Sequence, residues 1–170
     1  MSPDVERDLV RRARSGSADA FDALMRAHQD RLYRFVLVRG ACAADAQDIV
    51  QDTFLAAWRY LDSYRERWRF STWLYTIARR QASGRGMAHD ELPEALVDPN
   101  VRPDQAVLNG QRRENIWSVA RKLLPSDWFD VLWLYYAEDR RIREIARILG
   151  RSSAWVKVTL HRSRKRLAEL

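Results

Sequence analysis

The chain has 170 residues, which suits one domain of ordinary size or two small domains joined by a linker. A hydrophobic fraction of 46% and 7 Trp exclude an intrinsically disordered chain, although 31% of the residues are charged. The formal net charge of +7 favours an anionic partner, which is either nucleic acid or an anionic membrane surface.

The sequence gives no reason to expect membrane insertion or metal binding. The longest apolar run, residues 131–137, is far shorter than the roughly 20 residues of a membrane helix. The first residues also lack the pattern of a signal peptide. Cys42 is the single cysteine, and His28, His89 and His161 lack ligand spacing. We therefore expect a soluble, cytoplasmic protein with no metal site and no cofactor.

The fold class predicted from the sequence is all-α. Glycine and proline are scarce, six and five in all, and apolar residues recur at intervals of three and four. The first helix is expected to follow Ser2-Pro3 and to end at Gly16. The second helix should follow Ser17 and stop near Gly40.

A third helix is expected to begin near Ala44. The acids Asp45, Asp48 and Asp52 lie on its outward face, within a basic protein. Such an acidic row is often only a solvated face, but the neighbouring segments are suited to nucleic acid, so we interpret it as a docking surface for a basic partner. Its inward apolar stripe is formed by Ala46, Ile49, Val50, Phe54, Ala57, Trp58 and Leu61.

The segment from Trp58 to Gly86 combines arginine with aromatic residues. It contains seven arginines, two acids and seven of the eighteen aromatics, and Ser71 or Thr72 is expected to cap a fourth helix within it. Aromatic rings offer unpaired bases a stacking surface and arginines follow the phosphate backbone, so the segment predicts binding of single-stranded or melting nucleic acid. The alternative is a helical core with surface arginines, but a four-helix core cannot absorb so many aromatic side chains.

Residues 87–110 differ in composition from the rest of the chain, with three prolines, five acids and one base. We interpret them as an acidic linker between two small helical domains, residues 1–86 and residues 111–170. Helical spacing resumes after the linker, and Pro125-Ser126 marks a new helix start.

Residues 141–162 have the layout of a helix-turn-helix. Gly150 permits a left-handed turn after the first helix, and Ser152 or Ser153 caps the second. Ten Lys or Arg and one acid, Glu144, lie between residues 140 and 166. A helix this basic suits a major groove, whereas a plain helical hairpin or a basic membrane-surface helix explains the pattern less well. The expected buried residues are Ile142, Ile145, Ala146, Leu149, Val156 and Leu160.

Together these segments resemble the two conserved regions of extracytoplasmic-function sigma factors, and the resemblance covers nearly the whole chain. Residues 44–58 resemble the region-two helix that binds the β′ clamp of RNA polymerase, and residues 71–79 resemble the next helix, which faces the −10 element. Residues 124–167 resemble region four, whose helix-turn-helix reads the −35 element.

The resemblance implies binding to core RNA polymerase and to promoter DNA, with no catalytic residue. The core-polymerase contact would comprise Asp45, Asp48, Gln51 and Asp52. The loop over residues 62–69 would capture a flipped base, and the residues facing the −10 element and the opened strand would be Tyr64, Arg65, Arg67, Trp68, Trp73, Arg79 and Arg80. The −35 duplex would contact Ser153, Lys157, His161, Arg162 and Arg164.

The resemblance also implies an anti-sigma factor as a further partner and a path for the acidic linker along the RNA channel of the polymerase. Gln47 stands where the clamp helix often has Glu, so one negative charge is missing. Phosphorylation of Thr53 would add roughly −1.5 to −2 charges near the acidic row. The simpler expectation is that three aspartates suffice and that Thr53 is an ordinary helix residue.

Two other classes of protein explain the sequence less well. A stand-alone helix-turn-helix regulator explains the C-terminal residues but gives the aromatic loop and the acidic row no purpose. A nucleic-acid enzyme would need a carboxylate cluster for metal ions or a histidine-based nucleophile, and the sequence shows neither pattern.

Overall fold

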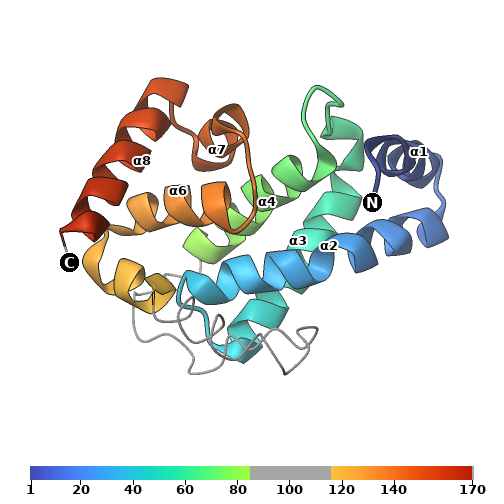
Figure 1. Cartoon of the computed structure of the whole chain (residues 1–170). Coiled ribbons are helices and arrows are strands. Elements are labelled where there is room, and N and C mark those ends of the chain that lie inside the picture. Colours follow the sequence, from blue (N-terminus) through green and yellow to red (C-terminus); the bar gives the residue numbers. More distant parts are fainter. Residues whose placement is uncertain (85–115, 170) are drawn as a thin grey trace, which may run out of the picture.

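A computed structural model describes residues 1–84 and 116–169, and the regular structure in these two ranges is helical. The predicted all-α class is confirmed. The predicted linker, residues 87–110, lies outside the described residues, so the domain boundaries stay a prediction. The helices shown in Figure 1 are α1 (Pro3–Arg14), α2 (Ala18–Val38), α3 (Ala43–Arg59), η1 (Leu61–Ser63), α4 (Phe70–Gly84), a helical segment at 116–123, α6 (Ser126–Tyr136), α7 (Ile142–Leu149) and α8 (Ser153–Ala168).

Side-chain caps explain why several helices begin where the sequence predicts. The hydroxyls of Ser2, Ser17 and Ser152 accept hydrogen bonds from backbone N–H groups three residues later, at the starts of α1, α2 and α8. The start of α4 differs from the prediction. It begins at Phe70, so Ser71 and Thr72 lie inside its first turn and their hydroxyls are free to bond elsewhere.

Glycines that follow α1, α2 and α7 have backbone conformations that other residues rarely adopt. Gly16 follows α1 with φ of 92°, and Gly150 follows α7 with φ of 64°. The left-handed turn predicted at Gly150 is therefore confirmed, and it connects the two helices of the predicted helix-turn-helix.

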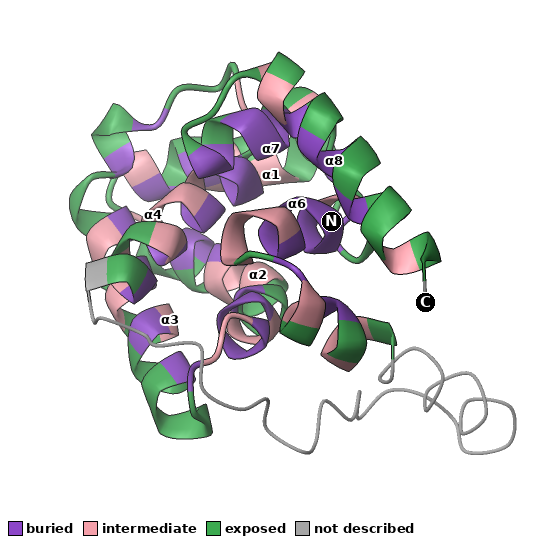
Figure 2. Cartoon of the chain, turned by 90° about the vertical axis from the view of Figure 1, so that its left-hand side faces the viewer, coloured by how far each residue is buried: buried purple, intermediate pink, exposed green. Residues whose placement is uncertain are grey.

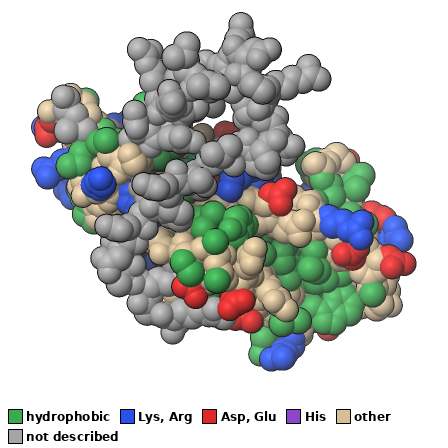
Figure 3. Space-filling model, turned by 90° about the horizontal axis from the view of Figure 1, so that it is seen from below, with side chains coloured by type: hydrophobic (Ala, Val, Ile, Leu, Met, Phe, Trp, Pro, Cys, Tyr) green, Lys and Arg blue, Asp and Glu red, His purple; other side chains and the backbone are tan. Residues whose placement is uncertain are grey.

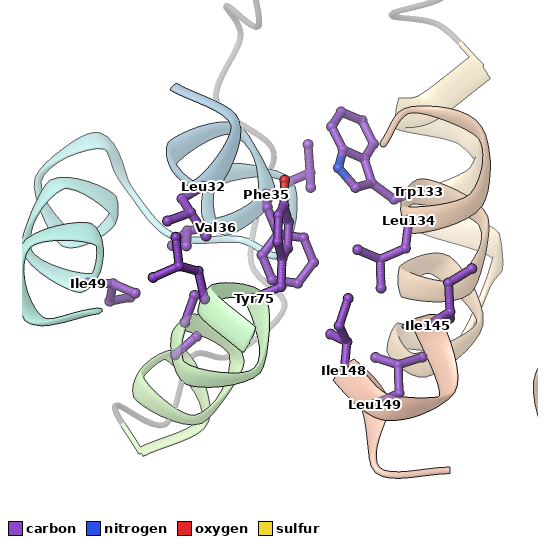
Figure 4. Close-up of a cluster of buried hydrophobic side chains, with 14 of the residues drawn as sticks. Leu32, Phe35, Val36, Ile49, Tyr75, Trp133, Leu134, Ile145, Ile148 and Leu149 are labelled. Atoms are coloured by element: carbon purple, nitrogen blue, oxygen red, sulfur yellow. The ribbon is translucent and has the colours of Figure 1, made fainter. Parts of the chain in front are cut away.

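One apolar core runs through both halves of the protein. Phe35 of α2 and Tyr75 of α4 meet Trp133 and Leu134 of α6, and Ile148 of α7 completes the contact (Figure 4). Burying a large apolar side chain contributes roughly 1.5–3 kcal/mol. Helix α4 lies between the other N-terminal helices and α6 and α7, and buried residues line the facing sides of the helices (Figures 1 and 2).

Helix α3 buries most of the stripe that its sequence predicts, with Thr53 in addition and with Val50 only half-buried. Ala46, Ile49, Phe54 and Ala57 are buried, and Thr53 is buried beside them. Trp58, expected in the core, is 42% exposed. Within the described ranges, every helix is too short or too polar to cross a membrane.

Candidate nucleic-acid and protein interfaces

The first turn of α4 is joined to the C-terminal half by two buried hydrogen bonds. Arg140 Nη1 donates to Ser71 Oγ at 2.7 Å, and Thr72 Oγ1 donates to Glu144 Oε1 at 2.8 Å. All four side chains are buried, and Arg140 also lies over the Tyr75 ring, 4.9 Å from its centre. Buried polar groups are expensive to leave without partners, so these bonds make the contact between the halves specific.

Glu144 accepts hydrogen bonds at the start of α7 and from α4. Its Oε2 accepts the backbone N–H of Arg141 at 3.0 Å, as the residue at N3 of a capping box does, and so fixes the start of α7. Its other oxygen accepts the Thr72 hydroxyl, and Arg69 Nε lies 3.9 Å from the same atom. The first helix of the helix-turn-helix is therefore tied to α4 through a single carboxylate.

A second polar contact joins α2 to α6. Arg39 and Asp130 form a hydrogen-bonded ion pair, and Arg121 donates to the carbonyl oxygen of Val38. Burial raises the pKa of Asp130, and the attraction of Arg39 only partly opposes this shift. Burial, together with repulsion from Arg39, lowers the pKa of Arg121.

The C-terminal half covers part of the predicted strand-binding surface. Asp127 Oδ1 lies 3.7 Å from Arg79 Nη2, and Asp127 Oδ2 accepts a hydrogen bond from Arg151 at 2.9 Å. Arg80, one residue further along α4, is exposed. Arg79, predicted to face promoter DNA, therefore has a carboxylate partner in this arrangement.

In the loop between η1 and α4, the aromatic residues are buried or half-buried, whereas the arginines are exposed. Tyr64 is buried, donates its hydroxyl to the Trp68 carbonyl at 2.5 Å, and packs with Trp73 against Phe70. Burial raises the pKa of Tyr64 to about 12, helped by two nearby glutamates. Exposed to solvent are Arg65, Arg67 and Arg69, whereas Trp68 is half-buried.

The aromatic packing divides the predicted strand-binding residues by role. Tyr64 and Trp73 support the loop in this arrangement, while the guanidinium of Arg67 stacks 5.8 Å from the centre of the Trp68 ring at the surface. The assignment of these residues to the opened strand stays a prediction: Arg65 and Arg67 are exposed, Trp68 and Trp73 are half-buried, and Tyr64 is buried.

A pH prediction concerns Glu6 of α1, which lies beside this loop. Burial raises the pKa of Glu6. His28, 3.0 Å away, and the backbone N–H of Phe70 lower it, and together they outweigh burial, so the net shift is downward from 4.5. Its contribution to the free energy of unfolding is therefore present above about pH 4.5 and is lost as the pH falls through the lower pKa of the folded protein.

Chemical unfolding of wild type and Glu6→Gln between about pH 6 and pH 3 measures this contribution. We expect the stability of wild type to fall more steeply with acid than that of Glu6→Gln. Asp4→Asn is the control, because Asp4 lies on the same helix with its side chain 91% exposed. Parallel curves for wild type and Glu6→Gln would contradict the prediction.

The helix-turn-helix presents its cations to solvent. Exposed on α8 are the predicted −35 contacts Lys157, His161, Arg162 and Arg164, while Ser153 is half-buried at the helix start. The predicted buried residues are buried, apart from Ile142, which is half-buried. A hollow of about 390 Å³ is lined by Trp68 of the loop and by Arg143, Arg147 and Arg151.

On α3, the predicted polymerase contact lies on an outward face. Asp45, Asp48 and Gln51 are exposed and Asp52 is half-buried, and the apolar side chains of Leu55 and Trp58 are exposed further along the helix. Acidic and basic side chains also lie beside apolar patches on the uncovered part of the face seen from below (Figure 3). A surface of mixed acidic and apolar character suits a protein partner better than nucleic acid.

The suggested phosphorylation of Thr53 is wrong for this conformation. The Thr53 side chain is 0% exposed, and its hydroxyl donates to the Ile49 carbonyl at 2.6 Å. Thr53 follows Ile49 by four residues and so shares the inward face of α3. Gln47, the residue whose missing charge prompted the suggestion, is exposed.

Comparison with known proteins identifies both halves. Residues 24–84 match sigma-70 region 2, and residues 122–167 match sigma-70, region 4, together more than half of the chain. The ECF RNA polymerase sigma factor BldN of Streptomyces coelicolor is 30% identical, over 96% of this chain and 64% of BldN. The ECF RNA polymerase sigma factor SigW of Bacillus subtilis is 27% identical, over 93% of this chain and 92% of SigW.

The arrangement of the helices also has a solved counterpart. The structure of CnrH in complex with the cytosolic domain of CnrY superimposes with a TM-score of 0.73 over 97% of this chain and 96% of that one, at 24% identity. The matches to sigma-70 regions 2 and 4 show that the chain belongs to the sigma-70 family of RNA polymerase sigma factors. Within that family it is a sigma factor of the extracytoplasmic-function type.

Proposed function

We propose that this chain is an alternative sigma factor that binds core RNA polymerase, recognises the −35 and −10 promoter elements and assists strand opening. The observation that carries the proposal is that both family regions occur in one chain, each with exposed cations where DNA would lie. It supplies recognition and not catalysis, and it acts in the cytoplasm. A stand-alone regulator would use α7 and α8 but would leave the outward face of α3 and the aromatic loop without a role.

Promoter binding by both regions requires the two halves to move apart. Arg79 pairs with Asp127, and the first turn of α4 is covered by Glu144 and Arg140. Recognition of the −10 element by α4 would need these contacts to break. The protein in Figure 1 is thus best interpreted as a closed arrangement, distinct from the one that engages a promoter.

An anti-sigma factor is the proposed further partner. CnrH is seen in complex with the cytosolic domain of CnrY, and the sigma factor RpoE of Bartonella quintana in complex with the anti-sigma factor NepR has a TM-score of 0.67 to this chain. A partner that binds both halves while they are closed would stabilise that arrangement by mass action.

Run-off transcription from a library of promoters tests the proposed function. The chain and core RNA polymerase together should give transcripts that start at a defined position downstream of shared −35 and −10 sequences. Core polymerase alone and the chain alone are the controls. Specific DNA binding by the chain alone, with no effect on core polymerase, would favour the stand-alone regulator instead.

The α8 cations give a prediction about salt dependence. Replacing Lys157 and Arg162 by alanine should weaken promoter binding by the holoenzyme across all sequences and reduce the slope of log K against log[salt] by about 2, because two phosphate contacts are lost. The double variant Arg11→Ala/Arg12→Ala removes two exposed charges from α1 and is the matched control. An unchanged slope in the α8 variant would remove these residues from the DNA surface.

A further inference from the structure

Helix α1 lies next to the loop that connects η1 to α4 (Figure 1). It precedes the residues that match sigma-70 region 2, which begin at residue 24. Two of its side chains reach the loop, one at each end. Neither side chain belongs to the buried apolar face of α1, which is formed by Val10 and Ala13.

Arg14 of α1 binds the beginning of the loop. Its Nη2 donates to the carbonyl oxygen of Tyr64, and its Nε donates to that of Leu61 at 3.4 Å. Its Nη1 lies 3.8 Å from Glu66 Oε1, and the guanidinium stacks 5.6 Å from the centre of the Tyr64 ring. One planar group with five donors therefore fixes the turn that leads into the exposed arginines.

Glu6, two turns earlier on α1, binds the end of the loop. Its carboxylate accepts the backbone N–H of Phe70, the first residue of α4. His28 of α2 lies 3.0 Å from the same carboxylate, and its ring packs 5.8 Å from that of Phe70. Glu6 and His28 are only 14% and 12% exposed, so the contact is shielded from water.

Tyr64 connects the two anchored ends. Its backbone carbonyl accepts from Arg14, its hydroxyl donates to the Trp68 carbonyl, and its ring packs on Phe70. The residues between the anchors, including Arg65 and Arg67, are thereby presented to solvent on a backbone whose ends are fixed.

We propose that α1 positions the loop between η1 and α4, which is predicted to capture the opened strand, and that Arg14 and Glu6 are the positioning residues. This inference rests on the proposed function of the loop in promoter opening. Ordering a loop costs conformational entropy, and a loop that is already ordered does not lose that entropy when it binds the opened strand. Loosening the anchors should therefore slow strand opening while leaving core binding and −35 recognition intact.

The test compares Arg14→Gln, Arg14→Lys and Arg11→Gln in the full chain with core RNA polymerase. Arg11 is the matched control, because it lies on the same helix, is exposed, and pairs with the half-buried Asp8 three residues earlier. Strand opening on a duplex promoter is measured by permanganate reactivity. On the same promoter opened in advance across the −10 element, formation of a competent complex is measured by abortive transcription. Core affinity is measured for each variant in parallel.

We expect Arg14→Gln to open the duplex promoter about tenfold more slowly than wild type, with unchanged core affinity, and to be within about twofold of wild type on the opened template. The opening rate of Arg14→Lys should lie between those of wild type and Arg14→Gln. An ammonium group keeps the charge but cannot span two carbonyls and Glu66. Arg11→Gln should match wild type. A variant that is merely less well folded would lose activity on both templates and lose core affinity as well.

Two results would overturn the inference while leaving the proposed function standing. In one, Arg14→Gln opens the duplex promoter as fast as wild type; in the other, it is impaired equally on both templates. Failure of the wild-type holoenzyme to open any promoter would overturn the proposed function and the role of α1 with it. The wild-type measurement therefore separates the two failures.

Discussion

Reversing the charge of both Asp48 and Asp52 to lysine should weaken binding to core RNA polymerase by about 100-fold or more at low salt. These acids lie on the outward face of α3, whose inward face is packed in the core. Like charges placed opposite a basic partner cost several kcal/mol, and each 1.4 kcal/mol corresponds to a factor of ten in affinity. The fold should survive, because neither side chain belongs to the buried stripe of α3.

The matched control is Asp22→Lys/Asp30→Lys on α2, which makes the same change in net charge at two exposed positions. Core affinity of all three proteins is measured by pull-down and by titration at several salt concentrations. Equal weakening in both double variants would mean that net charge, and not the outward face of α3, governs binding. Normal core binding by the α3 variant would show that this face is not the contact.

The starts of α1, α2 and α8 and the helix-turn-helix were predictable because they depend on local chemistry. Serine caps and the left-handed Gly150 act within a few residues of where they stand, so the sequence reveals them directly. The apolar stripe of α3 is likewise a property of one helix. The burial of Thr53 was also available from the sequence, since it lies four residues after Ile49 on the same face.

The packing of the two halves was not predictable in the same way. Periodicity shows that a helix has an apolar face but does not show which other helix that face meets. Ser71 and Thr72 resemble ordinary caps in sequence, yet their partners are 69 and 72 residues away. Arg14 and Asp130 equally resemble solvated charges until the fold brings Tyr64 and Arg39 beside them.

The sequence did not predict which aromatic residues stay at the surface. Trp58, expected in the core, is 42% exposed, and its ring packs edge-on against Phe21 at 4.9 Å. Tyr64 and Trp73 instead pack against Phe70. Only contacts between rings from different segments decide which aromatic stays at the surface, and composition does not report those contacts.

Replacing Asp130 by alanine should lower the free energy of unfolding by about 3–5 kcal/mol, because it leaves Arg39 without its partner in a buried site. The side chain of Arg39 is 15% exposed and that of Asp130 is 2% exposed. Burial, together with repulsion from Arg39, already lowers the pKa of Arg121, and the variant removes the Asp130 carboxylate that opposes this shift. Asp22→Ala, which breaks an exposed pair with Arg26, should cost no more than about 1 kcal/mol.

Replacing both partners tests whether the pair itself stabilises the closed arrangement. Burial raises the pKa of Asp130 despite Arg39, which means that desolvation of the carboxylate outweighs the attraction of the guanidinium. The double variant Arg39→Met/Asp130→Leu should therefore be about as stable as wild type, or more stable, when the two are compared by guanidinium chloride unfolding. Suppose instead that the double variant loses as much stability as Asp130→Ala. The ion pair would then be a net source of stability, and the contact between α2 and α6 would depend on charge and not on the apolar core around Phe35 and Trp133.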